Sequence, residues 1–241
     1  MRYPHILPVL LIGILPLTGT ADVSLPNIFG NHMVLQRGVP LHIWGTADAG
    51  EEVSIKFGPR TFSTTADDDG SWKIGLPSLK ADGGKSHKMT IKGRNTIVLE
   101  DILIGDVWIG SGQSNMEWNL NQSEGRDKFI KEANHPGIRL FHIPKKQFDT
   151  PQADVDAKWK PCTSANIPGF SAVLYHFGKT VNADQKVPVG LINSSWGGSP
   201  IEPWTVTEQG SGKMYNGMIA PIVKFPVTGT IWYQGETNVI Q

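Results

Sequence analysis

The pattern of apolar residues changes once along this sequence, at about residue 105, and that change constrains the fold more than any other feature. Before it, short segments rich in branched and aromatic residues recur at near-regular spacing, with turn residues between them. After it, apolar segments of strand length alternate with a segment of helical periodicity, which is typical of a parallel sheet covered by helices. We therefore expect two different halves, residues 22–104 and residues 105–241.

The first half is predicted to be a small all-β sandwich. Residues 53–57 alternate apolar and polar side chains, as a half-buried strand does. Several short strands separated by turn signals such as Asp69-Gly70 indicate a sandwich. The predicted strands cover residues 33–36, 41–45, 53–57, 72–76, 88–92 and 96–99. With its own alternating pattern, this half should be the more independent folding unit.

The second half is predicted to be α/β, and specifically a three-layer parallel sheet with helices on both faces. Predicted strands cover residues 106–110, 138–143, 187–193 and 229–233. Apolar residues at helical spacing between Phe170 and Val181 predict an amphipathic helix over 169–184. Ligands of such sheets bind beyond the carboxyl ends of the strands.

Residues 1–21 are predicted to be a secretory signal peptide. Arg2 precedes an apolar stretch at 6–17, and small residues follow it. The stretch is shorter than the roughly 20 residues that cross a membrane, and Pro8 and Pro16 disfavour a buried helix instead. We therefore expect a secreted or periplasmic protein with no membrane span after cleavage.

Charge and cysteine content narrow the possible partners. Lys plus Arg and Asp plus Glu both number 22, so no basic excess is present to bind nucleic acid. The one cysteine, Cys162, cannot form an internal disulfide. No group of Cys and His residues has metal-site spacing, so we expect neither a metal nor a cofactor. The sequence sets no oligomeric state.

Three clusters of glycine and small polar residues follow predicted strands, at 110–116, 193–200 and 233–238. In the first, Gly112 permits a tight turn and Ser114 could be a nucleophile beside backbone donors. Met116 stands where the α/β-hydrolase motif Gly-x-Ser-x-Gly has its last glycine, so that motif is absent. One such cluster alone is more simply read as a connecting turn, but three at successive strand ends indicate chemistry.

The other two clusters contain candidate donors for a substrate. Backbone N–H groups near Gly197 could bind an oxyanion, and Asn238 or Gln234 could add an amide donor. Glu236 could bind a substrate hydroxyl, although a carboxylate at a helix start explains it equally well. Trp196 could stack on a sugar, as could Trp118 and Trp204, with buried packing as the default for each.

Long motifs in these clusters resemble the sialate O-acetylesterase family of SGNH hydrolases. They are Asp-Val-Trp-Ile-Gly-Ser-Gly-Gln-Ser-Asn-Met-Glu-Trp, Gly-Leu-Ile-Asn-Ser-Ser-Trp-Gly-Gly-Ser-Pro-Ile-Glu-Pro-Trp, Tyr-Asn-Gly-Met-Ile-Ala-Pro and Ile-Trp-Tyr-Gln-Gly-Glu-Thr-Asn. The resemblance, which extends over residues 22–241, implies a serine esterase that hydrolyses O-acetyl esters on sialic acids or related sugars. It implies that Ser114 is the nucleophile and that Gly197, or its neighbour Gly198, donates a backbone N–H to the oxyanion. It also implies an amide donor, for which Asn238 is the best match and Gln234 a close competitor.

One family feature is missing from the sequence. The family's Asp-x-x-His block, which supplies the catalytic base, matches none of the seven histidines. His176 lies in the predicted helix and is better explained by packing than as the base. We therefore expect 105–241 to be the N-terminal part of a hydrolase domain, incomplete in a C-terminally truncated chain. The alternative is a non-catalytic carbohydrate-binding protein or an inactive fragment.

Overall fold

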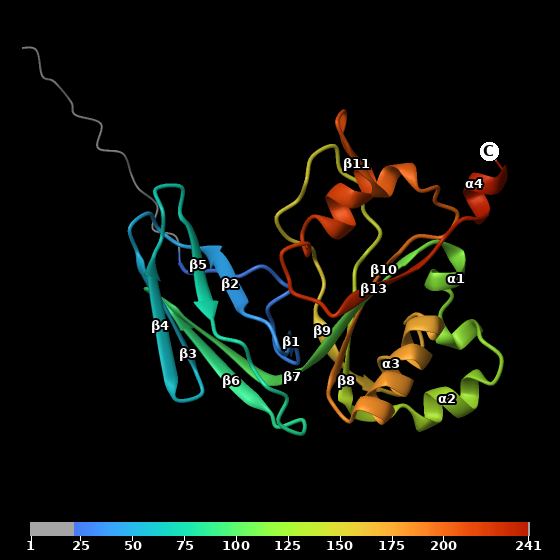
Figure 1. Ribbon diagram of the computed structural model, residues 1–241, viewed down its shortest axis with the longest axis horizontal. Coiled ribbons are helices and arrows are strands. Elements are labelled where there is room, and N and C mark those ends of the chain that lie inside the picture. The colour runs from blue at the N-terminus through green and yellow to red at the C-terminus, as the bar shows by residue number, and fades with distance from the viewer. Residues whose placement is uncertain (1–21, 241) are drawn as a thin grey trace, which may run out of the picture.

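The computed structural model describes residues 22–240, so the predicted signal peptide lies outside the described residues. The first half consists of β-strands in two sheets, one small and one that is part of a larger mixed sheet (Figure 1), and we refer to it as the sandwich. Two antiparallel strands form one layer, and four antiparallel strands form the other. The two layers are β2 (Leu41–Thr46) with β5 (Ser71–Leu76), and β4 (Arg60–Thr65), β3 (Glu52–Phe57), β6 (His87–Lys92) and β7 (Thr96–Gly112).

Strand β7 does not end with the sandwich: it is 17 residues long and continues into the second half. Its first part pairs with β6, and Leu103–Gly105 pairs with the short parallel strand β1 (Val34–Gln36). Its last part lies between two parallel strands of the second half. The change of pattern at residue 105 therefore falls inside a strand, and β7 crosses the molecule (Figure 1).

A bend in β7 at Asp101 accompanies its passage between the halves. Asp101 has a positive φ of 53°. Its carboxylate accepts hydrogen bonds from the Arg139 guanidinium at 2.9 Å and contacts the His32 ring at 2.7 Å. Burial raises the pKa of Asp101, but the hydrogen bond with His32 and the charge of Arg139 outweigh it and lower the pKa. The charged Asp101 thus joins the bend to β8.

The sheet of the second half has the strand order β13-β7-β10-β8-β9. Four of these strands are parallel, as predicted, but the edge strand β9 is antiparallel to β8. Through β7 the sheet continues into the sandwich, which gives one mixed sheet of nine strands. Besides β7, the strands of the second half in this sheet are β8 (Asn134–His142), β9 (Trp159–Thr163), β10 (Val189–Ser195) and β13 (Gly229–Tyr233).

The two faces of this sheet are covered differently. On one face, Leu140 of β8 and Leu191 of β10 belong to a core cluster with Leu174 and Tyr175 of α3. The helices on this side are α1 (Ser114–Glu117), η1 (Leu120–Gln122), α2 (Arg126–Glu132) and α3 (Ala172–Gln185), the last matching the predicted helix (Figure 1).

The opposite face carries less helix than the sequence pattern predicts. Phe141 and Ile192 point to this side and belong to a core cluster with Met218 of the five-residue helix η3 (Tyr215–Ile219). Loops and the sandwich complete the cover. The remaining elements are η2 (Glu202–Trp204), β11 (Val206–Thr207), β12 (Gly210–Ser211) and α4 (Glu236–Ile240).

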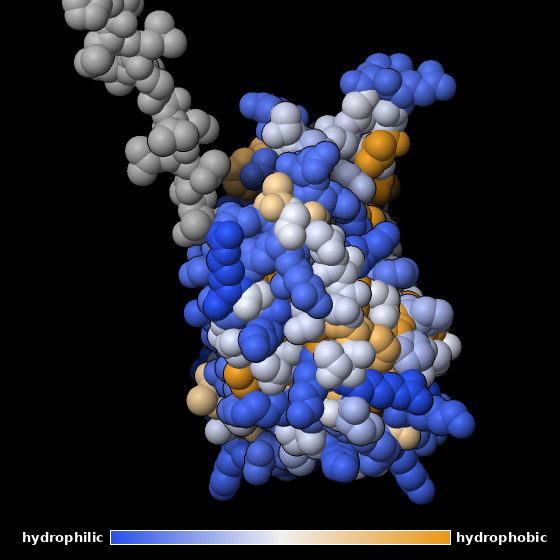
Figure 2. Space-filling model, turned by 90° about the vertical axis from the view of Figure 1, so that its left-hand side faces the viewer, coloured by the Kyte–Doolittle hydropathy of each residue, from blue (hydrophilic) through white to orange (hydrophobic). Residues whose placement is uncertain are grey.

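The sandwich and the second half share one hydrophobic core. The same cluster includes Ile43 and Ile55 of the sandwich and Phe141 and Ile192 of the second half. Trp159 also joins them, since its indole N–H donates to the Ile28 carbonyl at 2.8 Å. The outer face of the sandwich is mainly hydrophilic (Figure 2). Between residues 22 and 240, no helix is long and apolar enough to span a membrane.

Candidate active site

The three sequence clusters meet at the carboxyl ends of β7, β10 and β13. Gly112 lies opposite Ser195 of β10 and Tyr233 of β13 in the parallel register. The Trp196 N–H donates to the Gly112 carbonyl at 3.0 Å, and the Gln113 N–H donates to the Tyr233 carbonyl at 2.9 Å. These bonds join the turn after β7 to the turns after β10 and β13, so the chain segments 110–116, 193–200 and 233–238 lie together, as the sequence pattern predicts.

Gly112 is required where β7 turns toward α1. Its φ is +125°, and a Cβ atom there would lie 2.1 Å from the Tyr233 carbonyl oxygen. No side chain fits this position without moving β13. The glycine therefore lets the chain reverse directly before Gln113 and expose the residue that follows.

Ser114 is that exposed residue, and it is the first residue of α1. Within the described part of the chain its hydroxyl has no hydrogen-bond partner. It opens onto a pocket of about 230 Å³ lined by Ser114, Glu117, Trp118, Asn119 and Gln122. Gln113, in contrast, is buried, and its side-chain oxygen accepts the Thr237 N–H at 3.3 Å. Gln113 fixes the turn, and Ser114 is left accessible to a substrate.

The two candidate oxyanion glycines lie beside Ser114 but differ in their hydrogen bonds. A Cβ atom on Gly197 would lie 3.5 Å from the Ser114 Cα atom, which places this turn against the serine. The Gly197 N–H donates to a carboxylate oxygen of Glu117. Gly198 is exposed with φ +74°, and its N–H has no acceptor among the described residues.

The candidate amides of the third cluster bond to each other and to a carboxylate. The Asn238 side-chain N–H₂ donates to Glu202 at 3.1 Å, and its oxygen accepts from the Ile201 N–H at 2.9 Å. The Gln234 amide donates to the same Asn238 oxygen at 2.5 Å. Neither amide contacts Ser114 in this arrangement. Asn238 instead attaches α4 to the loop after β10, and Gln234 bonds to Asn238.

Glu236 lies at the start of α4 and accepts a hydrogen bond from the Asn115 side chain at 2.5 Å. This bond joins α4 to α1, which Figure 1 shows at the same end of the sheet. Glu236 is therefore a carboxylate at the start of a helix, and it also forms a structural hydrogen bond next to Ser114.

The three candidate tryptophans have different environments. Trp118 is 51% exposed and lines the Ser114 pocket, so its ring can contact a ligand. Trp196 is half-buried, and the Lys145 ammonium lies 5.9 Å from its ring centroid. Trp204 is buried and its indole N–H donates to Ser199 at 2.9 Å, which is a packing role.

Two charged residues of the site were not found by sequence reasoning. Glu117 binds Gly197 N–H with one oxygen and forms an ion pair with Lys145 through the other. The position of Glu117, three residues after Ser114, was a usable signal, since residues three apart share a helix face. No sequence pattern pointed to Lys145, because it is far from Ser114 in the chain and comes near it only where the parallel strands end side by side.

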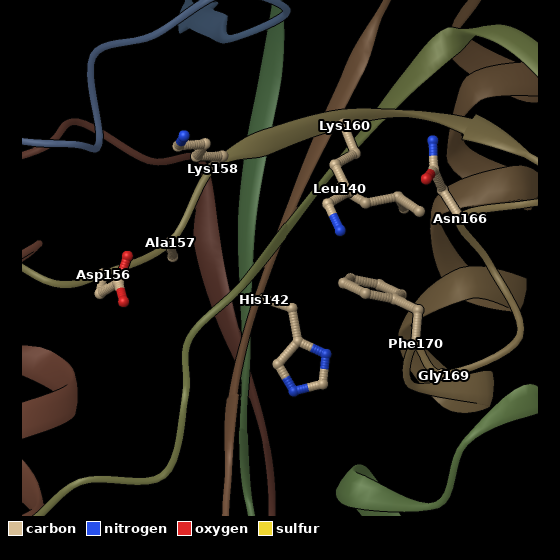
Figure 3. A pocket seen from close by; sticks show the side chains of 9 residues that line it. All are labelled: Leu140, His142, Asp156, Ala157, Lys158, Lys160, Asn166, Gly169 and Phe170. Carbon is tan, nitrogen blue, oxygen red and sulfur yellow. The ribbon is translucent and has the colours of Figure 1, made fainter.

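A second pocket, of about 420 Å³, lies at the carboxyl end of β8. His142, Lys160 and Phe170 line it from β8, β9 and the segment before α3 (Figure 3). Burial lowers the pKa of His142, the charge of Glu117 opposes this, and the charges of Lys145 and Lys160 add to it. The electrostatic effect of Glu117 therefore extends from the Ser114 pocket to this one.

Other nucleophiles and metal ligands give no competing site. Burial raises the pKa of Cys162 to about 12, so its thiol stays protonated. Within residues 22–240, no three His, Cys, Asp or Glu side chains are grouped as a metal site. No histidine of the described chain hydrogen-bonds to Ser114.

Comparison with known proteins gives the same family that the motifs resemble. Residues 104–241 match the family model described as carbohydrate esterase, sialic acid-specific acetylesterase. Sialate O-acetylesterase of Homo sapiens is 32% identical over an alignment 281 positions long, which covers 96% of this chain and 53% of that protein. The protein of the same name from Rattus norvegicus is 28% identical, with 86% and 51% covered.

A solved structure agrees in fold as well as in sequence. The crystal structure of a carbohydrate acetylesterase from Xanthomonas citri superposes with a TM-score of 0.86 at 37% identity, covering 90% of this chain and 52% of that one. The chain thus spans about half the length of the curated relatives it matches. On this evidence the chain belongs to the sialic acid-specific acetylesterase family of carbohydrate esterases.

Proposed function

We propose that the protein is a carbohydrate O-acetylesterase that uses Ser114 as its nucleophile. The observation that carries this proposal is the position of the serine. Ser114 follows a glycine-dependent turn at the end of a parallel strand, its hydroxyl is free, and it opens onto a pocket. Family membership supports ester hydrolysis as the reaction.

In the proposed reaction, the Ser114 oxygen attacks the acetyl carbonyl and forms a tetrahedral intermediate. The sugar alcohol leaves with a proton, and water then hydrolyses the acetyl-serine to acetate. Backbone N–H groups of Ser114 and of the turn at Gly197 and Gly198, which lies against the serine, would stabilise the oxyanion, the Gly197 N–H only after releasing Glu117. Asn238 could add a donor only after releasing Glu202.

The first step also requires a general base, because a serine hydroxyl is a poor nucleophile at neutral pH. The resemblance implies the histidine of an Asp-x-x-His block, and no such block occurs among the 241 residues. We therefore propose activity for the full-length protein, and little or none for residues 1–241 alone.

The proposed substrate is an O-acetylated sugar or an O-acetylated sialic acid. Relatives of the chain are named for sialate esters, and the similar Xanthomonas citri protein is a carbohydrate acetylesterase. The exposed Trp118 ring beside Ser114 suits the apolar face of a sugar. The predicted signal peptide at residues 1–21 supports the further proposal that the protein is secreted or periplasmic.

The nucleophile is tested with a fluorophosphonate probe, which reacts covalently with activated serines. The probe should label the full-length protein at Ser114, and Ser114→Ala should abolish the label. Ser164→Ala, which changes an exposed serine after β9, should be labelled like the wild type. Labelling that persists in Ser114→Ala would disprove the assignment.

The substrate class is tested by acetate release from a panel of O-acetylated sugars, including O-acetylated sialic acids. Release that depends on Ser114 supports an esterase. Sugar binding by the full-length protein without any acetate release would instead favour the carbohydrate-binding alternative.

A further inference from the structure

The residues Glu117, Lys145, Trp196 and Gly197 form a small cluster, here called the carboxylate clamp, beside the candidate nucleophile. They come from three different strand ends. Glu117 belongs to the turn after β7, Lys145 follows β8, and the turn containing Trp196 and Gly197 follows β10. The clamp therefore joins the three segments whose relative position decides the geometry of the Ser114 pocket.

Glu117 is fixed to the same helical turn as Ser114. The two residues are three apart in α1, so their side chains share a face. The Glu117 backbone N–H donates to the Gln113 carbonyl at 2.9 Å, which anchors this residue to the end of β7. One carboxylate oxygen then accepts the Gly197 N–H. The nucleophile and the neighbouring turn are thus connected through a single side chain.

The Gly197 N–H cannot donate to an oxyanion while it donates to Glu117. Gly198 follows it, is exposed, and has an N–H without an acceptor among the described residues. An oxyanion donor needs this property, because it must be free in the resting site and fixed in direction. The bond that occupies Gly197 fixes the peptide between Trp196 and Gly197, which is the neighbour of the peptide that carries the Gly198 N–H.

Lys145 balances the charge that this arrangement introduces. A carboxylate next to a developing oxyanion repels it, and the ion pair with the Lys145 ammonium offsets that repulsion. The same ammonium lies 5.9 Å from the Trp196 ring centroid, so the lysine is held on both sides.

We propose that Glu117, neutralised by Lys145, is a positioning residue that holds the Gly197 N–H, so that the Gly198 N–H, rather than that of Gly197, is the glycine donor to the oxyanion. This inference rests on the proposed function, since it assigns a donor to that reaction. Glu117 touches no reacting atom and acts through the turn that it holds.

The first test measures the rate at which the fluorophosphonate labels Ser114 in the full-length protein. Glu117→Ala removes the acceptor and should slow labelling by about 10- to 100-fold, the range for a misplaced oxyanion donor. Glu117→Gln retains an oxygen acceptor for the Gly197 N–H, so its labelling rate should fall by no more than about threefold. Only the contribution of the negative charge to that hydrogen bond is lost. Glu208→Ala, at an exposed position, is the control and should label like the wild type.

Lys145 is tested with a matched pair of adjacent lysines. Lys145→Met leaves Glu117 charged and unpaired, so labelling should slow by about 10-fold. Lys146→Met changes an exposed lysine without a side-chain partner among the described residues, and labelling should not change. Thermal unfolding of each variant separates a local effect from loss of the fold.

The second test does not depend on reactivity. In protein labelled with ¹⁵N-glycine, the Gly197 amide should exchange slowly with solvent, and Glu117→Ala should make it exchange fast. The Gly198 amide should exchange fast in both proteins, because it has no acceptor.

These outcomes separate the inference from the proposed function. Glu117→Ala that is labelled as fast as the wild type, or faster, would overturn the inference and leave Ser114 as nucleophile. A faster reaction would mean that the carboxylate obstructs the site. A folded wild type that is never labelled would contradict the proposed function and the role of Gly198, while exchange at Gly197 still reports on the clamp.

Discussion

At the scale of single residues, Gly112 carries the strongest structural constraint of the site. We expect Gly112→Ala to lower the free energy of unfolding by more than about 2 kcal/mol, because the substitution adds an overlap with β13 to the strain of a positive φ. Urea denaturation measures the loss.

Gly58 provides the matched control for that prediction. Its φ is +59°, but open space surrounds the position of a Cβ atom. Gly58→Ala should therefore cost only the backbone strain, about 1 kcal/mol. Equal losses in the two variants would show that the approach of Tyr233 to Gly112 is unimportant.

The sequence predicted that the three segments meet, but not the hydrogen bonds that their residues form. Ser114, Gly197 and Asn238 stand in long motifs after apolar strands, and the structure places all three segments at one edge. The partners of Gly197 and Asn238, which are Glu117 and Glu202, could not be inferred. A hydrogen bond between two loops depends on strand order and register, which single-sequence patterns do not specify.

At the scale of elements, α3 carries a positive charge next to two half-buried histidines. Burial, and then the charge of Lys179, lowers the pKa of both His135 and His176 below the ordinary value of 6.5. The unfolded chain therefore binds protons more readily, and the free energy of unfolding should fall as the pH drops from about 7.5 to about 5.5.

Lys179→Met tests this explanation. Removing the charge should raise the pKa of both histidines toward 6.5, so the loss of stability on acidification should be smaller than in the wild type. Lys73→Met, at an exposed position on β5, is the control. Urea midpoints at the two pH values give the comparison, and an unchanged or steeper loss in Lys179→Met would refute the role of this charge.

Elements with a clear apolar period were predicted well, and those without it were missed. The predicted strand 229–233 coincides with β13, and the helix predicted at 169–184 appears as α3. Strand β4, with the sequence Arg-Thr-Phe-Ser-Thr-Thr, is a largely exposed edge strand and has no apolar face to detect. Strand β9 contains Pro161, which local rules count against a strand.

At the scale of the whole molecule, the shared core argues against independent halves. The alternating pattern of residues 22–104 suggested a separate folding unit, but Ile43 and Ile192 lie in the same cluster. We therefore expect one cooperative unfolding transition. Ile43→Ala leaves a cavity in the sandwich and should lower the free energy of unfolding by about 2–5 kcal/mol. It should also reduce hydrogen-exchange protection in β10 as well as in β2.

Val206→Ala, at a position that is 60% exposed, is the control for that experiment and should change protection in neither strand. If Ile43→Ala lowers protection in β2 and leaves β10 unaffected, the halves unfold separately and the shared core does not couple them.

The continuity of β7 also restricts how proteins of this kind can recombine. The region matched by the family model begins at residue 104, yet a crossover there would cut a strand that runs from Thr96 to Gly112. A foreign N-terminal module grafted at that point would have to supply the first half of the strand in the correct register, or the serine at its other end would lose its support. Viable chimeras should therefore exchange the sandwich and the full length of β7 together, as one inherited block.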